Sequence, residues 1–217
     1  MDDPVGQYWS IRLERLEQAL RANNFEVFRA RDPAAAGKIV LEAIVAALAP
    51  RSVSFGGSTT LIASGVIEGL RALPKVEVIE TFDTAASPAE LTERRRRALT
   101  CDLFFAGANA VTEAGQLVNM DMIGNRTAPM QFGPRHVVVL AGRNKLVADL
   151  EAARARIKTY AAPVNAMRLD KKTPCVKTAR CEDCKSPERI CNAWGITEKS
   201  FPPGRIKVVL IDQECGL

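Results

Sequence analysis

The sequence has a single histidine, few aromatic residues and no long apolar run. Because His136 is the only histidine among 217 residues, a metal site built from two or more histidines is excluded. No stretch of about 18 apolar residues occurs, so we expect no membrane-spanning helix. The N-terminus, MDDPVGQYWS, lacks the basic start and apolar core of a secretion signal. We therefore expect a cytoplasmic protein.

The chain is mildly basic, with a net charge of +5 and a pI of about 9.0, which suits anionic ligands. Aromatic residues do not interleave with basic ones along a stripe, so we expect no nucleic-acid partner. The densest positive run spans residues 94–97, in ELTERRRRAL. Four consecutive arginines wrap around a helix instead of following one face, which predicts a solvated helix surface and not an anion site.

Strand and helix patterns alternate over residues 25–160. The expected strands are residues 25–30, 51–55, 75–80, 101–111, 136–142 and 205–212. The expected helices are residues 7–23, 33–48, 58–70, 87–99 and 144–161. This alternation predicts a Rossmann-like α/β fold, with a mostly parallel sheet covered by helices on both faces. Ligands of such sheets bind at the carboxyl ends of the strands.

Two segments interrupt the alternation. Residues 108–135 are rich in Gly, Asn, Asp and Thr, which predicts a β-rich insertion of short strands and turns. Residues 161–205 are rich in Pro, Cys and Lys and show no clear periodicity, which is typical of a functional or metal-stapled loop. We therefore expect an α/β domain over residues 1–160, a Cys-rich metal-binding extension over 161–205, and a C-terminal strand in 206–217 that returns to the domain.

A glycine-rich turn joins the strand ending at residue 55 to the helix that follows. Glycines permit a tight turn and a close approach to a ligand, and hydroxyl groups at the start of a helix can bind an anion. We therefore expect Gly56, Gly57, Ser58 and Thr59 to bind a ligand. The alternative is a plain turn in which Ser58 only caps the helix.

A polar segment follows the apolar strand 101–111 and should emerge at the same edge of the sheet. It offers Asn119, Asp121, Asn125 and Arg126 as ligand-binding residues, with Arg126 able to bind a carboxylate or phosphate through its guanidinium. Glu113 is a candidate catalytic carboxylate, as nucleophile or general base. Alternatively, these residues only satisfy the turns of a β-hairpin.

Four cysteines lie close together near the C-terminus, at Cys175, Cys181, Cys184 and Cys191. In a reducing compartment such clusters indicate metal or redox use more than disulfides. Four thiolates match the ligand number of an iron–sulfur cluster or of tetrahedral zinc. Their confinement to one short segment favours the iron–sulfur cluster, and zinc is the alternative. The cysteines could also be free or adventitiously oxidised.

The segments FGGSTTL, GANAVTEAGQLVN, GNR and GPRHVVVLAGRNKLV occur in this order along the chain. In combination they resemble the lactate-utilisation (LUD) domain family, which includes lactate utilisation protein C, over roughly residues 10–160. The cysteine tail is similar to an extension found in a subset of that family. The resemblance implies a fold like that of sugar-phosphate isomerases and CoA-transferases, with the ligand over Gly56 to Ser58. It also implies that Glu113 lies where relatives can carry a nucleophilic carboxylate.

Three functions are compatible with these observations. The first is a protein of organic-acid metabolism that binds a small anionic metabolite at the sheet edge, beside a four-cysteine metal centre. The second is a CoA-transferase-like group-transfer enzyme that uses Glu113. The third is a non-catalytic subunit whose basic cysteine tail docks other subunits of a lactate-oxidising complex.

Overall fold

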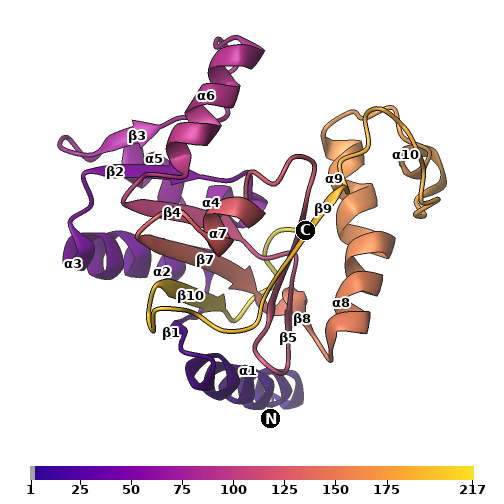
Figure 1. Cartoon of the computed structure of the whole chain (residues 1–217). Coiled ribbons are helices and arrows are strands. Elements are labelled where there is room, and N and C mark those ends of the chain that lie inside the picture. The colour runs from indigo at the N-terminus through magenta and orange to yellow at the C-terminus, as the bar shows by residue number, and fades with distance from the viewer. Residues whose placement is uncertain (1–2) are drawn as a thin grey trace.

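The centre of the protein is a six-stranded sheet, seen in a computed structural model that describes residues 3–217 (Figure 1). The strand order is β1-β10-β7-β4-β2-β3, and every pair is parallel. The strands are β1 (Glu26–Ala30), β2 (Ser52–Phe55), β3 (Glu77–Ile79), β4 (Leu103–Gly107), β7 (His136–Gly142) and β10 (Ile206–Ile211). The predicted Rossmann-like α/β class is thus confirmed, and the carboxyl ends of all six strands lie at one edge.

Helices cover both faces of this sheet, and several begin at a polar cap. The helical elements are α1 (Pro4–Ala22), α2 (Pro33–Lys38), η1 (Ile39–Val45), α3 (Ala46–Leu48), α4 (Thr59–Ala63), α5 (Val66–Arg71), α6 (Pro88–Ala98), α7 (Thr127–Gln131), η2 (Arg143–Lys145), α8 (Leu150–Arg156), η3 (Ile157–Ala161), α9 (Ala162–Arg168) and α10 (Cys175–Thr178). The side chains of Asp32, Ser87 and Asp149 accept hydrogen bonds from the first turns of α2, α6 and α8.

The alternation of side chains along each strand divides the core into two layers. On one face, Leu13, Leu16 and Leu20 of α1 pack with strand residues that include Val137 and Val139. On the other face, residues of η1, α4 and α5 pack with Val53, Phe105, Val138 and Leu140. Because the central strands are buried on both sides, they are nearly continuously apolar, as the sequence predicted.

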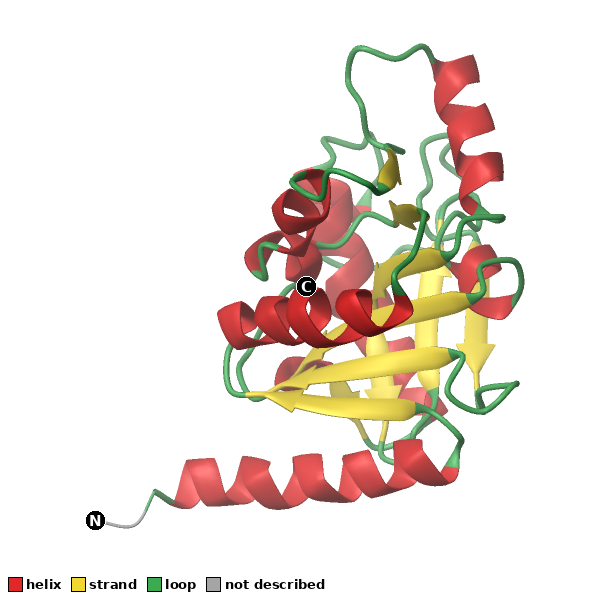
Figure 2. Ribbon diagram, turned by 90° about the vertical axis from the view of Figure 1, so that its left-hand side faces the viewer, coloured by secondary structure: helices red, strands yellow, loops and turns green. Residues whose placement is uncertain are grey.

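A second, four-stranded sheet lies beside the first and has the order β8-β5-β6-β9. Its strands are β5 (Ala110–Thr112), β6 (Leu117–Asp121), β8 (Leu146–Val147) and β9 (Ala193–Thr197). The long helical run α8–η3–α9 packs on this sheet through Ala153 and Ile157, and Figure 2 shows the layered arrangement from the side.

The structure differs from the sequence-based expectations in several places, three of which concern residues 101–205. The expected strand 101–111 is divided into β4 and β5, which belong to different sheets. The helix expected to end at residue 161 continues to Arg168, although the segment from 161 onward showed no clear periodicity. That same segment supplies β9, which pairs with β6, a strand more than seventy residues earlier in the chain.

Among the described residues 3–217, no helix has both the length and the apolar character that crossing a membrane requires.

Candidate functional site

A cavity of about 620 Å³ lies at the carboxyl edge of the six-stranded sheet. Loops that follow β2, β4 and β7 form part of its wall, through residues 57–60, residues 107–109 and Lys145. Helices α6 and α9, at the top and upper right of Figure 1, line it from two sides. The cavity therefore occupies the edge at which parallel sheets bind ligands, and where the sequence predicted a ligand.

The glycine turn is shaped by close packing against neighbouring segments. A side chain at Gly56 would overlap the side chain of Arg126, and one at Gly107 would overlap the hydroxyl of Ser58. The Ser58 Oγ accepts a hydrogen bond from the backbone N–H of Leu61 at 3.3 Å and so caps α4. The helix predicted over residues 58–70 is interrupted because Gly65 adopts a φ of +69° between α4 and α5. Gly57, Ser58 and Thr59 line the cavity, whereas Gly56 supports Arg126 from behind.

Asp121 and Arg126 form an ion pair at the end of β6. The Arg126 Nε donates to Asp121 Oδ1 at 2.6 Å, and the backbone N–H groups of Arg126 and Thr127 donate to Asp121 Oδ2. The Asp121 side chain is 1% exposed and that of Arg126 is 14% exposed. The Arg126 Nη2 donates to Asn109 Oδ1 and to the carbonyl oxygen of Met120. These bonds fix the guanidinium at the cavity wall. The negative charge of the Asp121 carboxylate is neutralised by Arg126.

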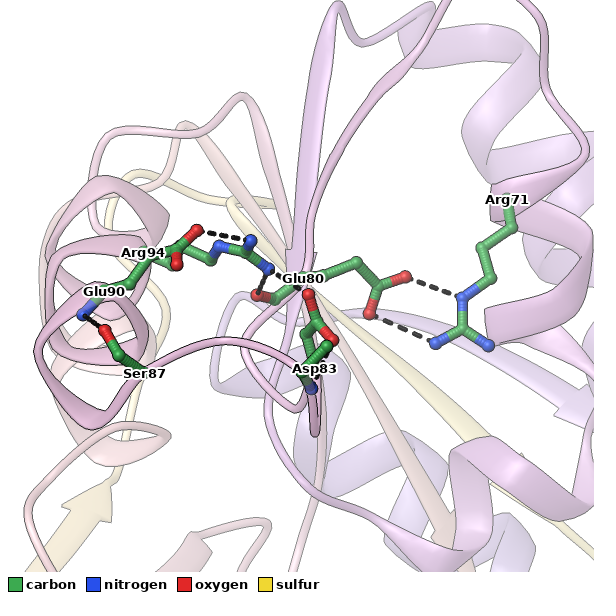
Figure 3. A network of polar contacts seen from close by, with 7 residues as sticks. Arg71, Glu80, Asp83, Ser87, Glu90 and Arg94 are labelled. Atoms are coloured by element: carbon green, nitrogen blue, oxygen red, sulfur yellow. Dashed lines mark hydrogen bonds and ion pairs between the residues drawn. The ribbon is translucent and has the colours of Figure 1, made fainter.

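Helix α6 presents Arg95 to the cavity while its neighbours bind elsewhere. Figure 3 shows Arg94 donating to Glu90 and Asp83, and Arg71 donating to Glu80. The Arg71 Nε lies 2.6 Å from Glu80 Oε1. These contacts tie the loop after β3 to both α5 and α6.

Two other arginines of the run 94–97 also form ion pairs: Arg96 pairs with Glu93, and Arg97 pairs with Glu77. Arg95 lines the cavity, and its Nε is buried without a hydrogen-bond partner among residues 3–217. The prediction of a wholly solvated helix surface is therefore wrong at Arg95.

Lys145 lies at the cavity wall, directly after β7, and is only 2% exposed. Burial, the nearby guanidinium of Arg156 and, to a lesser extent, that of Arg126 lower the pKa of its amine to about 7, while Cys215 acts in the opposite direction. Arg156 is itself fixed beside Lys145, since it donates to the carbonyl oxygens of Asn144 and Asn109. In the described part of the chain, no hydrogen bond or ion pair engages the Lys145 amine. Such an amine is partly neutral at physiological pH.

The cavity carries a marked excess of positive charge. Its cationic side chains are Arg95, Arg126, Lys145, Arg168 and Lys171. Within residues 3–217, Asp121 is the one carboxylate side chain in its wall, and that carboxylate is bound to Arg126. Apolar side chains, among them Phe82, Leu91 and Ile123, line other parts of the wall. This combination suits a ligand with an anionic group and an apolar body.

Most of the ligand-binding residues predicted from the sequence meet at this cavity. Gly57, Ser58, Thr59, Asp121, Asn125 and Arg126 line it. Asn119 lies behind the wall, 1% exposed, and its Nδ2 donates to the carbonyl oxygen of Gly107 at 2.8 Å.

Glu113 lies outside the cavity. Its side chain is 56% exposed and pairs with Arg12 of α1 at 2.6 Å. The catalytic role of Glu113 stays a prediction, and the geometry of the cavity does not favour it.

The sequence did not predict several polar residues of the cavity wall, among them Asn109, Arg95 and Lys145. Lys145 and Asn109 each follow the carboxyl end of a buried parallel strand, and this position was the signal available in the sequence. Arg95 carried no comparable signal, because its three neighbours in the chain have the same side chain.

The four cysteines of the C-terminal segment do not converge on one point. All four are free and partly buried, and residues 3–217 contain no group of three or more His, Cys, Asp or Glu side chains arranged to hold a metal ion. Cys175 Sγ lies 3.2 Å from the hydroxyl of Thr173, and Cys181 Sγ accepts from the backbone N–H of Asp183. This conformation does not fit a four-thiolate centre. An iron–sulfur or zinc centre therefore stays a prediction, one that requires the segment to rearrange.

Comparisons with known proteins agree with this architecture. The sequence profile of the LUD domain family matches residues 13–211. The fold is similar to the crystal structure of a DUF162 family protein from Deinococcus radiodurans, with a TM-score of 0.51 and 13% sequence identity. That likeness covers 94% of this chain and 98% of the other. No curated protein sequence matched the chain. The chain belongs to the LUD domain family, which is consistent with a protein of the lactate-utilisation type.

Proposed function

We propose that the protein acts in organic-acid metabolism and binds the anion of a small organic acid in the cavity at the sheet edge. The observation that carries this proposal is the charge of the wall: four cationic side chains, and Lys145 with its partly neutral amine, share the wall with one carboxylate side chain that is already paired. A cleft of one charge sign raises the local concentration of the oppositely charged ligand and strengthens its binding.

The proposed anion-binding groups are Arg95 and Arg126. Arg95 lines the cavity and has no ion pair in the described residues, so its guanidinium is available to a ligand carboxylate. Arg126 uses its Nε and Nη2 for contacts within the protein, so its Nη1 is the group left for a ligand. Arginine suits this role because its planar guanidinium matches the geometry of a carboxylate.

The volume of the cavity also bears on the ligand. A site of about 620 Å³ falls within the range of pockets that enclose ligands larger than lactate. The apolar side chains of Phe82, Pro88 and Leu91 lie on the α6 side of the wall, where they would contact the body of such a ligand. We therefore favour an acid with a hydrocarbon portion or a second acidic group.

Calorimetric titration with lactate, pyruvate, 2-oxoglutarate and phenylpyruvate tests this proposal. Arg95→Gln should weaken binding of the preferred acid by about tenfold or more, as expected for a lost charged hydrogen bond of about 1.5–3 kcal/mol. The matched control is Arg96→Gln, one position along α6, because Arg96 pairs with Glu93 outside the cavity. Equal affinities for the two variants, or no binding of any of the acids, would contradict the proposal.

A further inference from the structure

Lys145 is a buried lysine at the cavity wall without a partner among residues 3–217, and anion binding alone does not account for it. The residue is 2% exposed, yet it lies at the wall of a cavity that can hold a ligand. Within the described chain, its amine has no carboxylate partner, although buried lysines are usually paired. Lys207 provides the contrast: it is also buried, and it pairs with Glu26 at 2.9 Å and donates to the carbonyl oxygen of Gly204.

Three features of its surroundings disfavour the charged form of Lys145: burial, Arg156 and Arg126. The guanidinium of Arg156 is held next to it by the carbonyl oxygens of Asn144 and Asn109. Arg126 also lies in the cavity wall, where Asp121 holds it, and Lys145 itself is almost fully buried. Burial and these two cations lower the pKa of the amine to about 7. A lysine that is desolvated or placed beside another cation is the usual form of an amine nucleophile in enzymes.

We propose that Lys145 forms an imine with the carbonyl carbon of a 2-oxo acid bound in the cavity. This step rests on the proposed function, because the carboxylate held by Arg95 and Arg126 would place the neighbouring carbonyl group in the cavity beside the amine. A 2-oxo acid fits both features, since it has a carboxylate next to a ketone.

The reaction needs no oxidant or reductant. The lone pair of the neutral Lys145 amine attacks the carbonyl carbon, a C–N bond forms as the C=O π bond breaks, and one proton passes from the nitrogen to the oxygen to give a carbinolamine. Loss of water from the carbinolamine then gives the neutral imine, and its nitrogen takes up one proton from solvent. The net change is one amine, one ketone and one proton converted to one protonated imine and one water.

An imine of this kind withdraws electrons from the carbon atoms next to it. Removal of a proton or of a carboxylate group from C3, the carbon on the side of the imine away from the C1 carboxylate, becomes easier, because the cationic nitrogen accepts the electron pair. The reaction class expected for this site is therefore lysine-assisted chemistry at carbon adjacent to a carbonyl group.

Reductive trapping tests the proposal directly. The full-length protein is incubated at pH 7 with pyruvate or 2-oxoglutarate and sodium cyanoborohydride, and the labelled residue is identified by peptide mass spectrometry. We expect labelling at Lys145 to be about tenfold or more faster than at the exposed Lys172, because far more of the Lys145 amine is neutral. Lys145→Met should abolish this label, whereas the control Lys172→Met should retain it.

Two further arms separate this inference from the anion-binding proposal. If calorimetry shows that the oxo acid binds but no adduct forms at Lys145, imine formation is refuted and anion binding stands. If acetone, a ketone without a carboxylate, labels Lys145 as fast as the oxo acids do, the amine is reactive but anion recognition is refuted. Labelling spread evenly over surface lysines would refute the special role of Lys145. Circular dichroism of the Lys145→Met variant confirms that it is folded.

Discussion

Replacement of Lys145 by methionine should stabilise the protein, and the gain should depend on pH. The pKa of the amine falls from its ordinary 10.5 to about 7 on folding, so the unfolded chain holds the proton more tightly than the folded one. This difference in pKa corresponds to a loss of about 4–5 kcal/mol in the free energy of unfolding when Lys145 is charged in both states. The cost is complete below pH 7, where both states are protonated. It shrinks as the pH rises from 7 toward 10.5, because the folded state is then neutral.

Methionine fills a similar volume and carries no charge, so Lys145→Met removes this cost. The charged or titratable groups around the site, Arg126, Arg156 and Cys215, are the same in both proteins. We expect the free energy of unfolding in urea to rise by about 4–5 kcal/mol at pH 6 and by only about 2 kcal/mol at pH 9. The exposed Lys172→Met serves as the control and should show little change at either pH. A gain at Lys145 that is absent, or equal at pH 6 and pH 9, would refute the argument that this amine is desolvated.

Three other perturbations have definite expected outcomes. Asp121→Asn leaves the buried Arg126 guanidinium uncompensated and should lower the free energy of unfolding by about 3–5 kcal/mol; a change as small as that of the exposed control Asp170→Asn would contradict the buried ion pair. Glu113→Gln breaks only a surface pair with Arg12, so it should cost less than about 1 kcal/mol and leave oxo-acid binding unaltered. A glutamyl adduct formed from an acyl-CoA and lost in this variant would instead support the transferase alternative. For the four cysteines, the metal prediction expects iron with sulfide, or zinc, in protein isolated without oxygen, and absence of all three would refute it.

The sheet was predictable because its evidence is local. The apolar runs of β4, β7 and β10 mark buried parallel strands wherever they occur in a chain. The order of the strands was not predictable, since β10 inserts between β1 and β7 through contacts with segments far away in the sequence. Strand β9 was not predictable for the same reason, because it forms by pairing with β6, which is distant in the sequence.

The candidate site shows the same division between local and long-range information. The glycine turn and the segment around Asp121 and Arg126 were predicted because polar and glycine residues directly follow buried strands. Lys145 was missed, since its burial depends on Arg156 and on loops from other parts of the fold. Arg95 was missed because tertiary partners, and not sequence, distinguish it from the other arginines of its run.

Glu113 lies away from the cavity for a reason that its local sequence does not reveal. The turn between β5 and β6 carries its side chain to α1, where it meets Arg12 from the other end of the sequence. No local pattern could reveal this contact, because the two residues are separated by 101 positions.

A crystal structure of the protein soaked with 2-oxoglutarate tests the central claim most directly. The account predicts electron density for the acid at the carboxyl edge of the six-stranded sheet, with a carboxylate on Arg95 and Arg126 and the carbonyl carbon next to, or bonded to, Lys145. An empty cavity at saturating acid, or the acid bound at another surface, would contradict it.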